Sequence, residues 1–342
     1  MKAMILNKIS SLKTNRQPLV LVDIPIPEPR PNEVLIKVSV CGVCHTELDE
    51  IEGRTSPPKL PVVPGHQVVG TIVKLGSDTV NLKLGDRVGV AWIFSACGKC
   101  KFCVAGNENL CNQFLATGRD VNGGYAQYMA APENYVYPIP GIFTDTEAAP
   151  LLCAGAIGYR SIKLARLRDG QKLGLTGFGA SGHLVLKMVK HSYPNTSVYV
   201  FARKEEERKF AKKLGALWAG STTESCPEKL DSIIDTTPAW KPVVEAMGNL
   251  EKGGRLVINA IRKEEVDKDY LQRLSYAEHL WLEKEIKSVA NITGKDVTDF
   301  LELAAKASIK PETRLFPLED ANKALLELKE RHIKGAKVLK MD

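Results

Sequence analysis

The sequence lacks the features that would place the chain in a membrane or send it across one. No apolar run approaches the roughly 20 residues that span a bilayer. The first residues, MKAMILNKISSLKTNRQPL, have neither the apolar core nor the small-residue cleavage site of a signal peptide. We therefore expect a cytoplasmic protein without a membrane partner.

Charge of one sign is not concentrated anywhere, and no internal repeat or low-complexity segment is present. The net charge is +7, but acidic residues are mixed with basic ones, as in KEEERKFAKK. Such mixing is typical of solvated helix faces and argues against a groove for nucleic acid. The 44% of hydrophobic residues and the length of 342 residues suit a soluble protein of two domains.

Four of the eight cysteines are bunched in the pattern C-x2-C-x2-C-x7-C, at Cys97, Cys100, Cys103 and Cys111. In a reducing cytosol such clustering indicates metal binding rather than disulfides. Four thiolates complete the tetrahedral coordination of one zinc ion, which predicts a structural site. An iron–sulfur cluster is the alternative, because the first three cysteines share its spacing, although the fourth comes late and no proline follows it. Thiols without a ligand remain a further alternative.

A second pair of metal-binding side chains lies in the stretch CGVCHTELDEIEGRTSPPKLPVVPGHQVVG. The thiol of Cys44 and the imidazole of His66 make half of a zinc site. Alternating apolar residues over 34–40 predict a half-buried strand that delivers Cys41 and Cys44 at its end. Short strand patterns separated by glycine turns continue to about residue 150, so this part is expected to be mostly β.

From about residue 155 strands and helices alternate. Gly177, Gly179 and Gly182 form a GxGxxG pattern between an apolar strand and an amphipathic helix, and a second strand, SVYVFA, follows. Glycines there permit a tight turn, close approach of a pyrophosphate and close helix packing. The pattern predicts a dinucleotide-binding domain, and a plain glycine turn is the alternative.

The end of the second strand bears on the choice of nucleotide. An acidic residue there would bind the ribose hydroxyls of NAD, but the chain has Ala202, Arg203 and Lys204. Two cations at this place favour the 2′-phosphate of NADP. NAD remains possible, because Arg203 and Lys204 could simply begin a solvated helix.

The motifs GVCHTE, PGHQVVG, the four-cysteine lobe, LLCAGAIGY and GFGASG occur in one order. Together they resemble the zinc-dependent alcohol dehydrogenases of the medium-chain dehydrogenase/reductase superfamily, bacterial or archaeal type, over essentially the whole chain. The resemblance implies an α/β protein with a GroES-like, β-rich catalytic domain and a Rossmann domain with a doubly wound parallel sheet. We expect the catalytic domain over 1–153 and 292–342, with the zinc lobe near 95–112, and the Rossmann domain over 154–291.

The resemblance further implies reversible hydride transfer between primary alcohols or aldehydes and NAD(P), and a homo-oligomer, either a dimer or a tetramer. It assigns Cys44, His66 and Cys153 to a catalytic zinc with a fourth position open for water or substrate, so that each chain holds two zinc ions. Cys41 is then expected to be a small buried residue.

Roles for neighbouring residues follow from the same resemblance. Thr46 matches the hydroxyl that takes the alcohol proton, and Glu47 matches the carboxylate that orients the imidazole ligand. Asp49 stands where many relatives carry the outer histidine of the proton relay. His45 matches a contact with the cofactor phosphate, and Trp92 matches an aromatic wall of the substrate pocket.

The sequence departs from the family pattern in two further places. Gln67 replaces the glutamate that usually follows the zinc histidine, and Ala336 replaces an arginine aimed at the pyrophosphate, for which Lys337 is a possible substitute. Polyol and sugar dehydrogenases of the superfamily vary at the position of Gln67, so they remain an alternative, although the intact four-cysteine lobe argues against it. A non-catalytic protein that binds zinc and nucleotide is the alternative from another class.

Overall fold

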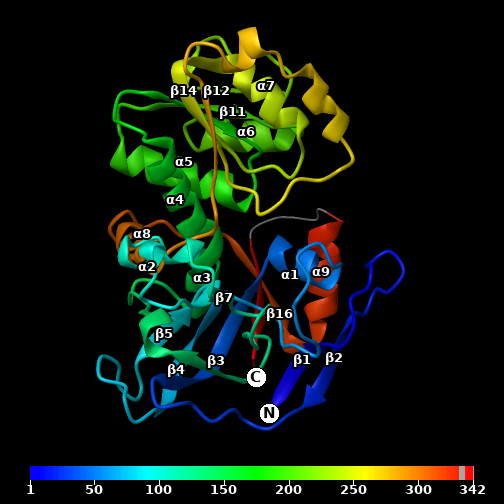
Figure 1. The fold of residues 1–342 in the computed structure, drawn as a ribbon, viewed down its shortest axis with the longest axis vertical. Helices are drawn as coiled ribbons and strands as arrows, with labels where there is room; N and C mark the ends of the chain where they lie inside the picture. The colour runs from blue at the N-terminus through cyan, green and yellow to red at the C-terminus, as the bar shows by residue number, and fades with distance from the viewer. Residues whose placement is uncertain (331–335, 342) are drawn as a thin grey trace. The chain divides into compact units, whose positions relative to one another are not determined.

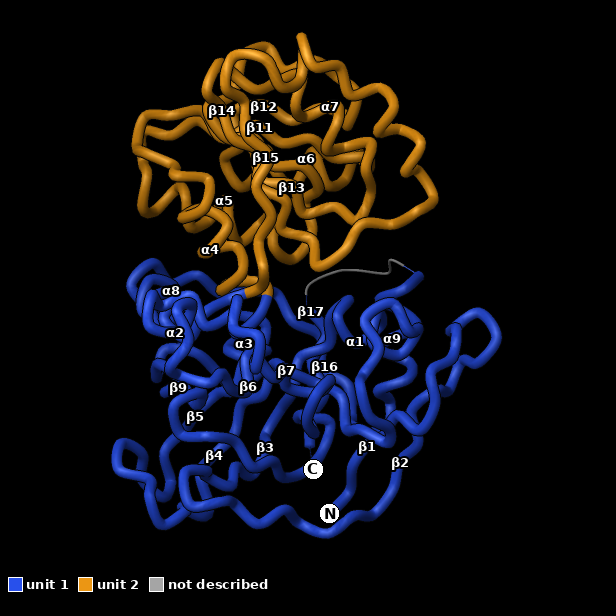
Figure 2. The backbone as a smooth tube through the Cα atoms, viewed as in Figure 1, with its two compact units in different colours: residues 1–153, 292–342 blue, residues 154–291 orange. Residues whose placement is uncertain are grey.

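The computed structural model describes residues 1–330 and 336–341 (Figure 1). The chain divides into two compact units, which Figure 2 shows in different colours. Unit 1 comprises Met1–Cys153 with Ile292–Asp342, and unit 2 comprises Ala154–Asn291. Among the described residues, none of the helices has the length and apolar character needed to cross a membrane.

Unit 1 is built on a seven-stranded sheet in the order β16-β17-β3-β4-β5-β9, with β8 also paired to β3. Strand β3 pairs with β4 along one edge, while β8 and β17 share its other edge. The strands of this sheet are β3 (Glu33–Val43), β4 (Val68–Leu75), β5 (Arg87–Val90), β8 (Tyr128–Pro132), β9 (Val136–Pro138), β16 (Thr313–Pro317) and β17 (Ala336–Lys340).

Strand β3 organises this sheet and delivers Cys41 and Cys44. The predicted strand is confirmed, but the expectation that it is half-buried holds only in part. Leu35, on the face expected to be exposed, is 7% exposed, whereas Lys37 on the same face is exposed. Strand β3 is paired along both edges, and α3 packs against it, which accounts for the burial of apolar residues beyond the expected face.

Two small sheets and a set of short helices complete unit 1. The small sheets are β1 (Lys2–Leu6) with β2 (Leu19–Asp23), and β6 (Ile93–Ser95) with β7 (Leu115–Ala116). The helices are α1 (His45–Ile51), α2 (Lys101–Val104), α3 (Asp145–Pro150), α8 (Gly294–Lys306) and α9 (Ala321–Lys329). Short 3-10 turns are η1 (Glu108–Leu110), η2 (Glu133–Tyr135) and η6 (Leu318–Asp320), and η3 (Leu151–Gly155) is a π-helical turn.

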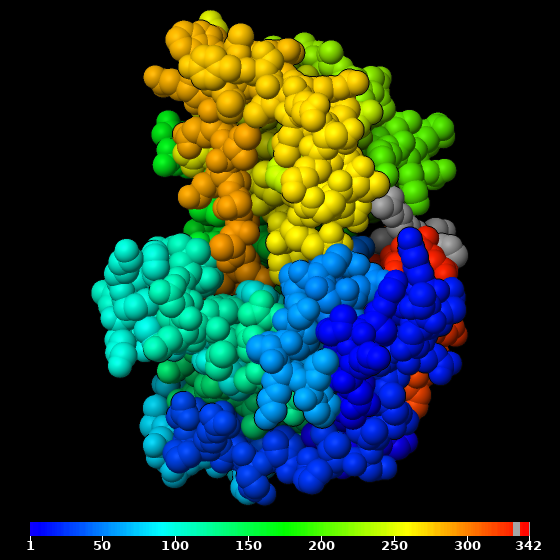
Figure 3. All heavy atoms as spheres, turned by 45° about the vertical axis from the view of Figure 1, so that its right-hand side comes forward, coloured from blue at the N-terminus to red at the C-terminus, as the bar shows by residue number. Residues whose placement is uncertain are grey.

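The two ends of the sequence meet in unit 1. In Figure 3 the deep blue N-terminal segment lies against the red C-terminal region that contains α9. Leu19 and Asn322 exchange two hydrogen bonds, of 3.1 and 2.8 Å, and Arg16 reaches Glu330 at 3.0 Å. These contacts fix α9, which packs beside α1, the helix that follows Cys44.

Unit 2 is a six-stranded parallel sheet in the order β12-β11-β10-β13-β14-β15. The strands are β10 (Lys172–Thr176), β11 (Ser197–Phe201), β12 (Trp218–Gly220), β13 (Leu230–Asp235), β14 (Leu250–Ile258) and β15 (Glu285–Ser288). The helices are α4 (Ala156–Ala165), α5 (Ala180–Ser192), α6 (Glu205–Lys213) and α7 (Lys241–Asn249), with shorter turns η4 (Lys268–Arg273) and η5 (Tyr276–Leu280). The strand order reverses between β10 and β13, which is the topological switch point where a doubly wound sheet binds its ligand.

Candidate active site and metal centres

Cys44 is held at the start of α1 by the first turn of that helix. It is the N-cap residue, with extended backbone, and its backbone N–H donates to Glu47 Oε2 at 2.8 Å. The backbone N–H of Thr46 donates to Cys44 Sγ at 3.4 Å. These reciprocal bonds form a capping box in which a cysteine takes the place of the usual serine or threonine. The partial positive charge of the helix N-terminus faces the Cys44 sulfur.

His66 precedes β4 and is 1% exposed. Its Nδ1 lies 2.5 Å from Glu47 Oε1 in an ion-pair contact, and a proton on Nδ1 would face this carboxylate. The other nitrogen, Nε2, is then free to act as a ligand, and it lies 3.6 Å from Cys44 Sγ. Glu47 therefore contacts both Cys44 and His66, and it occupies the place where an orienting carboxylate is expected.

Cys153 is presented by the π-helical turn η3. Pro150 is the last residue of α3 and has no N–H to donate to the preceding turn, so the regular helical ladder is interrupted there. The wider turn Leu151–Gly155 follows and brings Cys153 to the other two side chains. The ligand atoms of Cys44, His66 and Cys153 all lie within 4.8 Å of one another.

The distances in this triplet fit a zinc ion. Two ligands at about 2.3 Å for sulfur and about 2.0 to 2.1 Å for nitrogen, at a tetrahedral angle, lie about 3.5 to 3.6 Å apart. The Cys44–His66 separation of 3.6 Å agrees with this value. In the protein alone, a hydrogen bond with Cys153, burial and the charge of Glu47 raise the pKa of Cys44 well above its ordinary value. A bound cation would reverse this preference and hold the thiolate.

The four-cysteine lobe satisfies the same geometric test. Cys103 Sγ lies 3.9 Å from Cys97 Sγ and 3.6 Å from Cys100 Sγ, and all four sulfurs fall within 4.8 Å of one another. Thiolates that share one tetrahedral zinc are about 3.8 Å apart. An iron–sulfur cluster would spread its ligands over several iron atoms and hold the sulfurs farther apart. The geometry therefore favours a single ion.

Backbone N–H groups donate hydrogen bonds to the cysteine sulfurs of the lobe, and such bonds stabilise thiolates. Cys111 Sγ accepts from the backbone of Cys97 at 3.5 Å and of Gln113 at 3.3 Å. Hydrogen bonds from the backbone of Lys99 and Cys100 lower the pKa of Cys97 to about 6. Burial and the neighbouring thiols instead raise the pKa of Cys103 to about 12, as expected for four sulfurs competing for few donors.

The other residues predicted around the triplet are distributed along α1 and β5. Thr46 is 9% exposed and lies in the same helical turn as Cys44, while His45 is exposed beside it. Trp92 follows β5, and its ring stacks on Phe114 at 4.9 Å between ring centres. Cys41 is fully buried in the core of unit 1, as expected for a packing residue.

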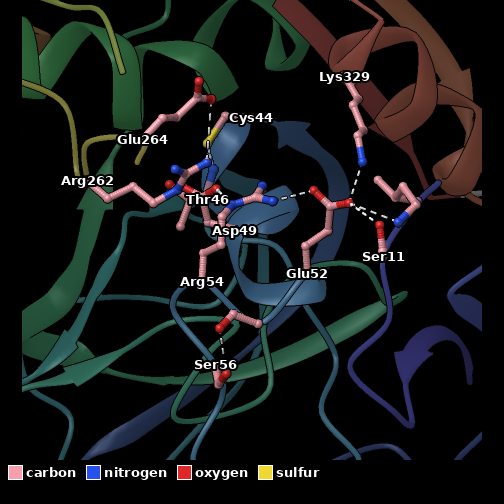
Figure 4. Close-up of polar contacts among 12 residues, drawn as sticks. Ser11, Cys44, Thr46, Asp49, Glu52, Arg54, Ser56, Arg262, Glu264 and Lys329 are labelled. Atoms are coloured by element: carbon pink, nitrogen blue, oxygen red, sulfur yellow. Dashed lines mark hydrogen bonds and ion pairs between the residues drawn. The ribbon is translucent and has the colours of Figure 1, made fainter. Parts of the chain in front are cut away.

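Asp49 is buried and accepts a 2.6 Å hydrogen bond from Arg54 Nε. Figure 4 shows Arg54 between this carboxylate and that of Glu52. Glu52 also accepts from the backbone N–H of Leu12 at 2.9 Å and contacts Lys329 of α9. Burial by itself would raise the pKa of Glu52, but hydrogen bonds from Lys329, Arg54 and Leu12 lower it to about 2.

The glycine-rich turn of unit 2 joins β10 to α5 and meets the requirements of a pyrophosphate site. Gly177 has φ of +77°, and a Cβ there would meet Thr236 Oγ1 at 2.8 Å. A Cβ at Gly182 would meet the carbonyl oxygen of Gly177 at 2.8 Å. A Cβ at Gly179, the N-cap of α5, would enter open space. Two of the glycines therefore serve the turn and the packing, while the third leaves room for a ligand to approach the backbone.

Arg203 and Lys204 follow the end of β11 and are exposed. Neither side chain hydrogen-bonds or ion-pairs with another described residue, so both are available to a phosphate. Arg208 of α6 fixes their backbone, because its Nη1 donates to the carbonyl oxygens of Ala202 at 2.8 Å and Arg203 at 2.9 Å. Sequence reasoning did not identify this role of Arg208.

Other features of the two sites were also missed. Lys263 forms a buried ion pair with Asp235 at the end of β13, beside the loop that contacts Gly177. Glu50 of α1 is buried, and His66 is among the groups that lower its pKa. Its position three residues after Glu47 places both on one helix face, a signal present in the sequence.

Lys337 does not support the expectation that it replaces the missing arginine. It is 3% exposed, and its ammonium group pairs with Glu327 at 2.7 Å. The cation also lies 5.1 Å from the ring centre of Phe316. These contacts engage Lys337 within unit 1.

Comparisons with known proteins agree with the fold. Residues 30–141 match the model of the alcohol dehydrogenase GroES-like domain. The chain is 38% identical over 327 residues to a probable alcohol dehydrogenase, AdhA, of Mycobacterium tuberculosis, covering 94% of this chain and 92% of that protein. It is 32% identical to an alcohol dehydrogenase of Geobacillus stearothermophilus, covering 100% of this chain and 99% of the relative.

Solved structures share the fold over nearly the whole chain. A cobalt- and zinc-bound thermostable alcohol dehydrogenase from Pyrobaculum aerophilum superposes with a TM-score of 0.85 at 23% identity, covering 99% of both chains. A Helicobacter pylori protein complexed with NADP(H) gives the same TM-score at 24% identity, again covering 99% of both.

A GroES-like unit and a Rossmann unit in one chain define an NAD(P)-dependent alcohol oxidoreductase. The chain belongs to the alcohol dehydrogenase family of the medium-chain dehydrogenases, and the family predicted from the sequence is confirmed.

Proposed function

We propose that this protein is a zinc-dependent dehydrogenase of primary alcohols and their aldehydes, with two zinc ions per chain and a preference for NADP over NAD. The observation that carries the proposal is the triplet Cys44, His66 and Cys153, with ligand atoms within 4.8 Å and a threonine in the same turn. A zinc ion bound by these residues would act as a Lewis acid that lowers the pKa of a substrate alcohol.

The protein's own groups handle the proton. Thr46 lies two residues after Cys44, and we assign its hydroxyl oxygen Oγ1 as the first acceptor of the alcohol proton. Asp49, one helical turn later, serves as the outer acceptor, and Arg54 keeps its carboxylate in place. Glu47 holds the proton of His66 on Nδ1, which keeps Nε2 available as a ligand.

The four-cysteine lobe supports the second, structural zinc. Its sulfur separations of 3.6 and 3.9 Å suit one tetrahedral ion. The complete set of four thiols leaves no coordination position for a substrate. This ion therefore stabilises the lobe, while catalysis belongs to the triplet.

The preference for NADP rests on Arg203 and Lys204. Both are exposed immediately after β11, where the ribose of a dinucleotide lies in this fold. Three glutamates, Glu205 to Glu207, begin α6 and oppose an anion, but Lys209 pairs with Glu205 at 2.8 Å. The two cations also precede the N-terminus of α6, which adds favourable partial charge for a phosphate.

Initial rates with benzyl alcohol and short 1-alkanols test the proposal directly. We expect turnover with both nucleotides and a larger kcat/KM with NADP. The variant in which Arg203 and Lys204 are both replaced by alanine should lose this preference, whereas Lys213→Ala, an exposed lysine at the end of α6, should keep it. Full turnover by a folded Cys44→Ala protein would refute the zinc mechanism, and turnover only on polyols would reassign the substrate class.

A further inference from the structure

Glu50 is a carboxylate in the interior of unit 1 that lacks a hydrogen-bond donor. It lies in α1 and is 1% exposed. Neither of its oxygens has a hydrogen-bond partner in the part of the chain that the structure describes. An isolated buried carboxylate is strongly disfavoured, because it loses its hydration and gains nothing in exchange. The position therefore calls for a proton or a nearby cation.

The charges around Glu50 point toward the metal centre. Burial is the main factor that raises its pKa, and the charge of Glu47 raises it further, whereas His66 and Arg119 lower it and Asp120 raises it. Arg119 is already occupied, because both oxygens of Asp120 accept from its guanidinium at 3.1 and 2.8 Å. The other neighbour that lowers the pKa of Glu50 is His66, the residue that offers Nε2 to the metal site.

The residue after His66 carries no charge of its own. Gln67 is 3% exposed, and its amide covers Gly42, where a Cβ would lie 2.4 Å from Gln67 Oε1. Its Nε2 has no hydrogen-bond partner among the described residues. The related enzymes usually carry a carboxylate at this position. Here Gln67 supplies no negative charge beside His66, and Glu50 is a carboxylate that could supply it instead.

We propose that Glu50 supplies from α1 the negative charge that Gln67 lacks, and that this charge stabilises the dication held by Cys44, His66 and Cys153. Glu50 is not among the residues whose ligand atoms lie within 4.8 Å, so it acts through space as a positioning residue and does not ligate the ion. In the metal-free protein Glu50 and Glu47 repel each other, and the bound cation relieves that repulsion. The inference rests on the proposed catalytic zinc site.

The test is the zinc affinity of the holoprotein, measured by competition with a chromogenic chelator. In E50Q, we expect the triplet to bind zinc about 10- to 100-fold more weakly, as found when outer partners of metal sites are removed. The four-cysteine lobe should retain its zinc unchanged. The double variant E50Q/Q67E moves the carboxylate from α1 to the position after His66 and should restore the affinity.

Two controls separate charge placement from general destabilisation. E52Q removes a carboxylate at the end of the same helix, where it contacts Arg54 and Lys329, and should leave the zinc affinity unchanged. The metal-free E50Q protein should melt at a higher temperature than the metal-free parent, because the cost of burying or protonating a carboxylate is gone. The single variant Q67E, which keeps Glu50, should bind zinc more tightly than the parent.

Wild-type zinc affinity in E50Q, or no recovery in E50Q/Q67E, would overturn the role of Glu50. A lower melting temperature of metal-free E50Q would do the same. If the parent instead retains no more zinc than Cys44→Ala, the catalytic zinc site itself is refuted, and the two failures are thereby distinguished.

Discussion

Asp49, on the helix that begins beside Cys44, accepts a 2.6 Å hydrogen bond at Oδ1 from Nε of Arg54, which follows that helix. A carboxylate in this state is fixed in one orientation, although it keeps lone pairs for a second donor. The ion pair thus gives a rigid outer group to a short proton path from Thr46. Its contribution can be separated from that of the metal ligands.

Replacement of Asp49 by asparagine should slow turnover by about tenfold or more, because it removes the outer proton acceptor. Asp49→Glu retains a carboxylate and should recover part of the rate, while both variants disturb the contact with Arg54. The measurement is kcat against pH for the three proteins. If D49N loses stability but keeps the parent's rate and pH profile, Asp49 is a structural anchor only.

Glu52 should make the protein sensitive to acid. Its folded-state pKa of about 2 lies below the unfolded value of about 4.3, so its contribution to stability is complete above pH ~4.3 and is lost as the pH falls toward 2. We estimate about 1 kcal/mol after allowing for solvent. Urea unfolding of the parent and E52Q should give stabilities that differ at pH 7 and converge near pH 2. A difference that grows on acidification would contradict the prediction.

Lys263 should support nucleotide binding from outside the glycine-rich turn. It pairs with Asp235 and donates to the backbone oxygens of Thr237 at 2.7 Å and Ala239 at 3.1 Å, which fixes the loop against Gly177. Lys263→Met leaves Asp235 buried and unpaired, which should lower the free energy of unfolding by about 3 to 5 kcal/mol.

Nucleotide binding by that variant can be followed by fluorescence titration at a temperature where it remains folded. We expect a weaker Kd for the dinucleotide, whereas Lys268→Met, an exposed lysine paired with Glu265, should behave as the parent. Equal affinity in both variants would confine Lys263 to a role in stability.

Removal of zinc from the four-cysteine lobe should loosen residues 97–111 before it affects the nucleotide unit. Without the ion, four thiols within 4.8 Å of one another have too few donors to remain ordered as thiolates. Hydrogen exchange after mild chelation should show faster exchange in this segment, while β10 and α5 stay protected. Simultaneous loss of protection in both regions would show that the lobe and unit 2 unfold together.

Local patterns allowed part of this structure to be predicted. The spacing of the four cysteines is set within one short loop, so their convergence follows from the sequence alone. The turn around Gly177 and its flanking strand and helix are equally local. Strand β4 also begins and ends where the apolar pattern indicated, because its turns carry glycine and aspartate.

Residue patterns did not predict which side chains that are far apart in the sequence come together in the fold. Nothing in the apolar sequence LLCAG marks Cys153 as a metal ligand, and only resemblance to the family assigned it. The pairs Asp49–Arg54 and Asp235–Lys263 depend on how side chains pack in three dimensions, which charge patterns along the chain do not determine. Burial of Glu50 depends on the same packing, although its helical spacing from Glu47 gave a usable signal.

The π-helical turn that carries Cys153 has a consequence for dissecting the protein. Cys153 is the final residue of the first segment of unit 1, and Ala154, its peptide neighbour, begins unit 2. Any truncation or fusion made at this boundary would leave a metal ligand at a frayed chain end. Recombination of catalytic and nucleotide-binding modules between relatives should therefore succeed only with crossovers placed well away from Leu151–Gly155, so that this turn is inherited whole.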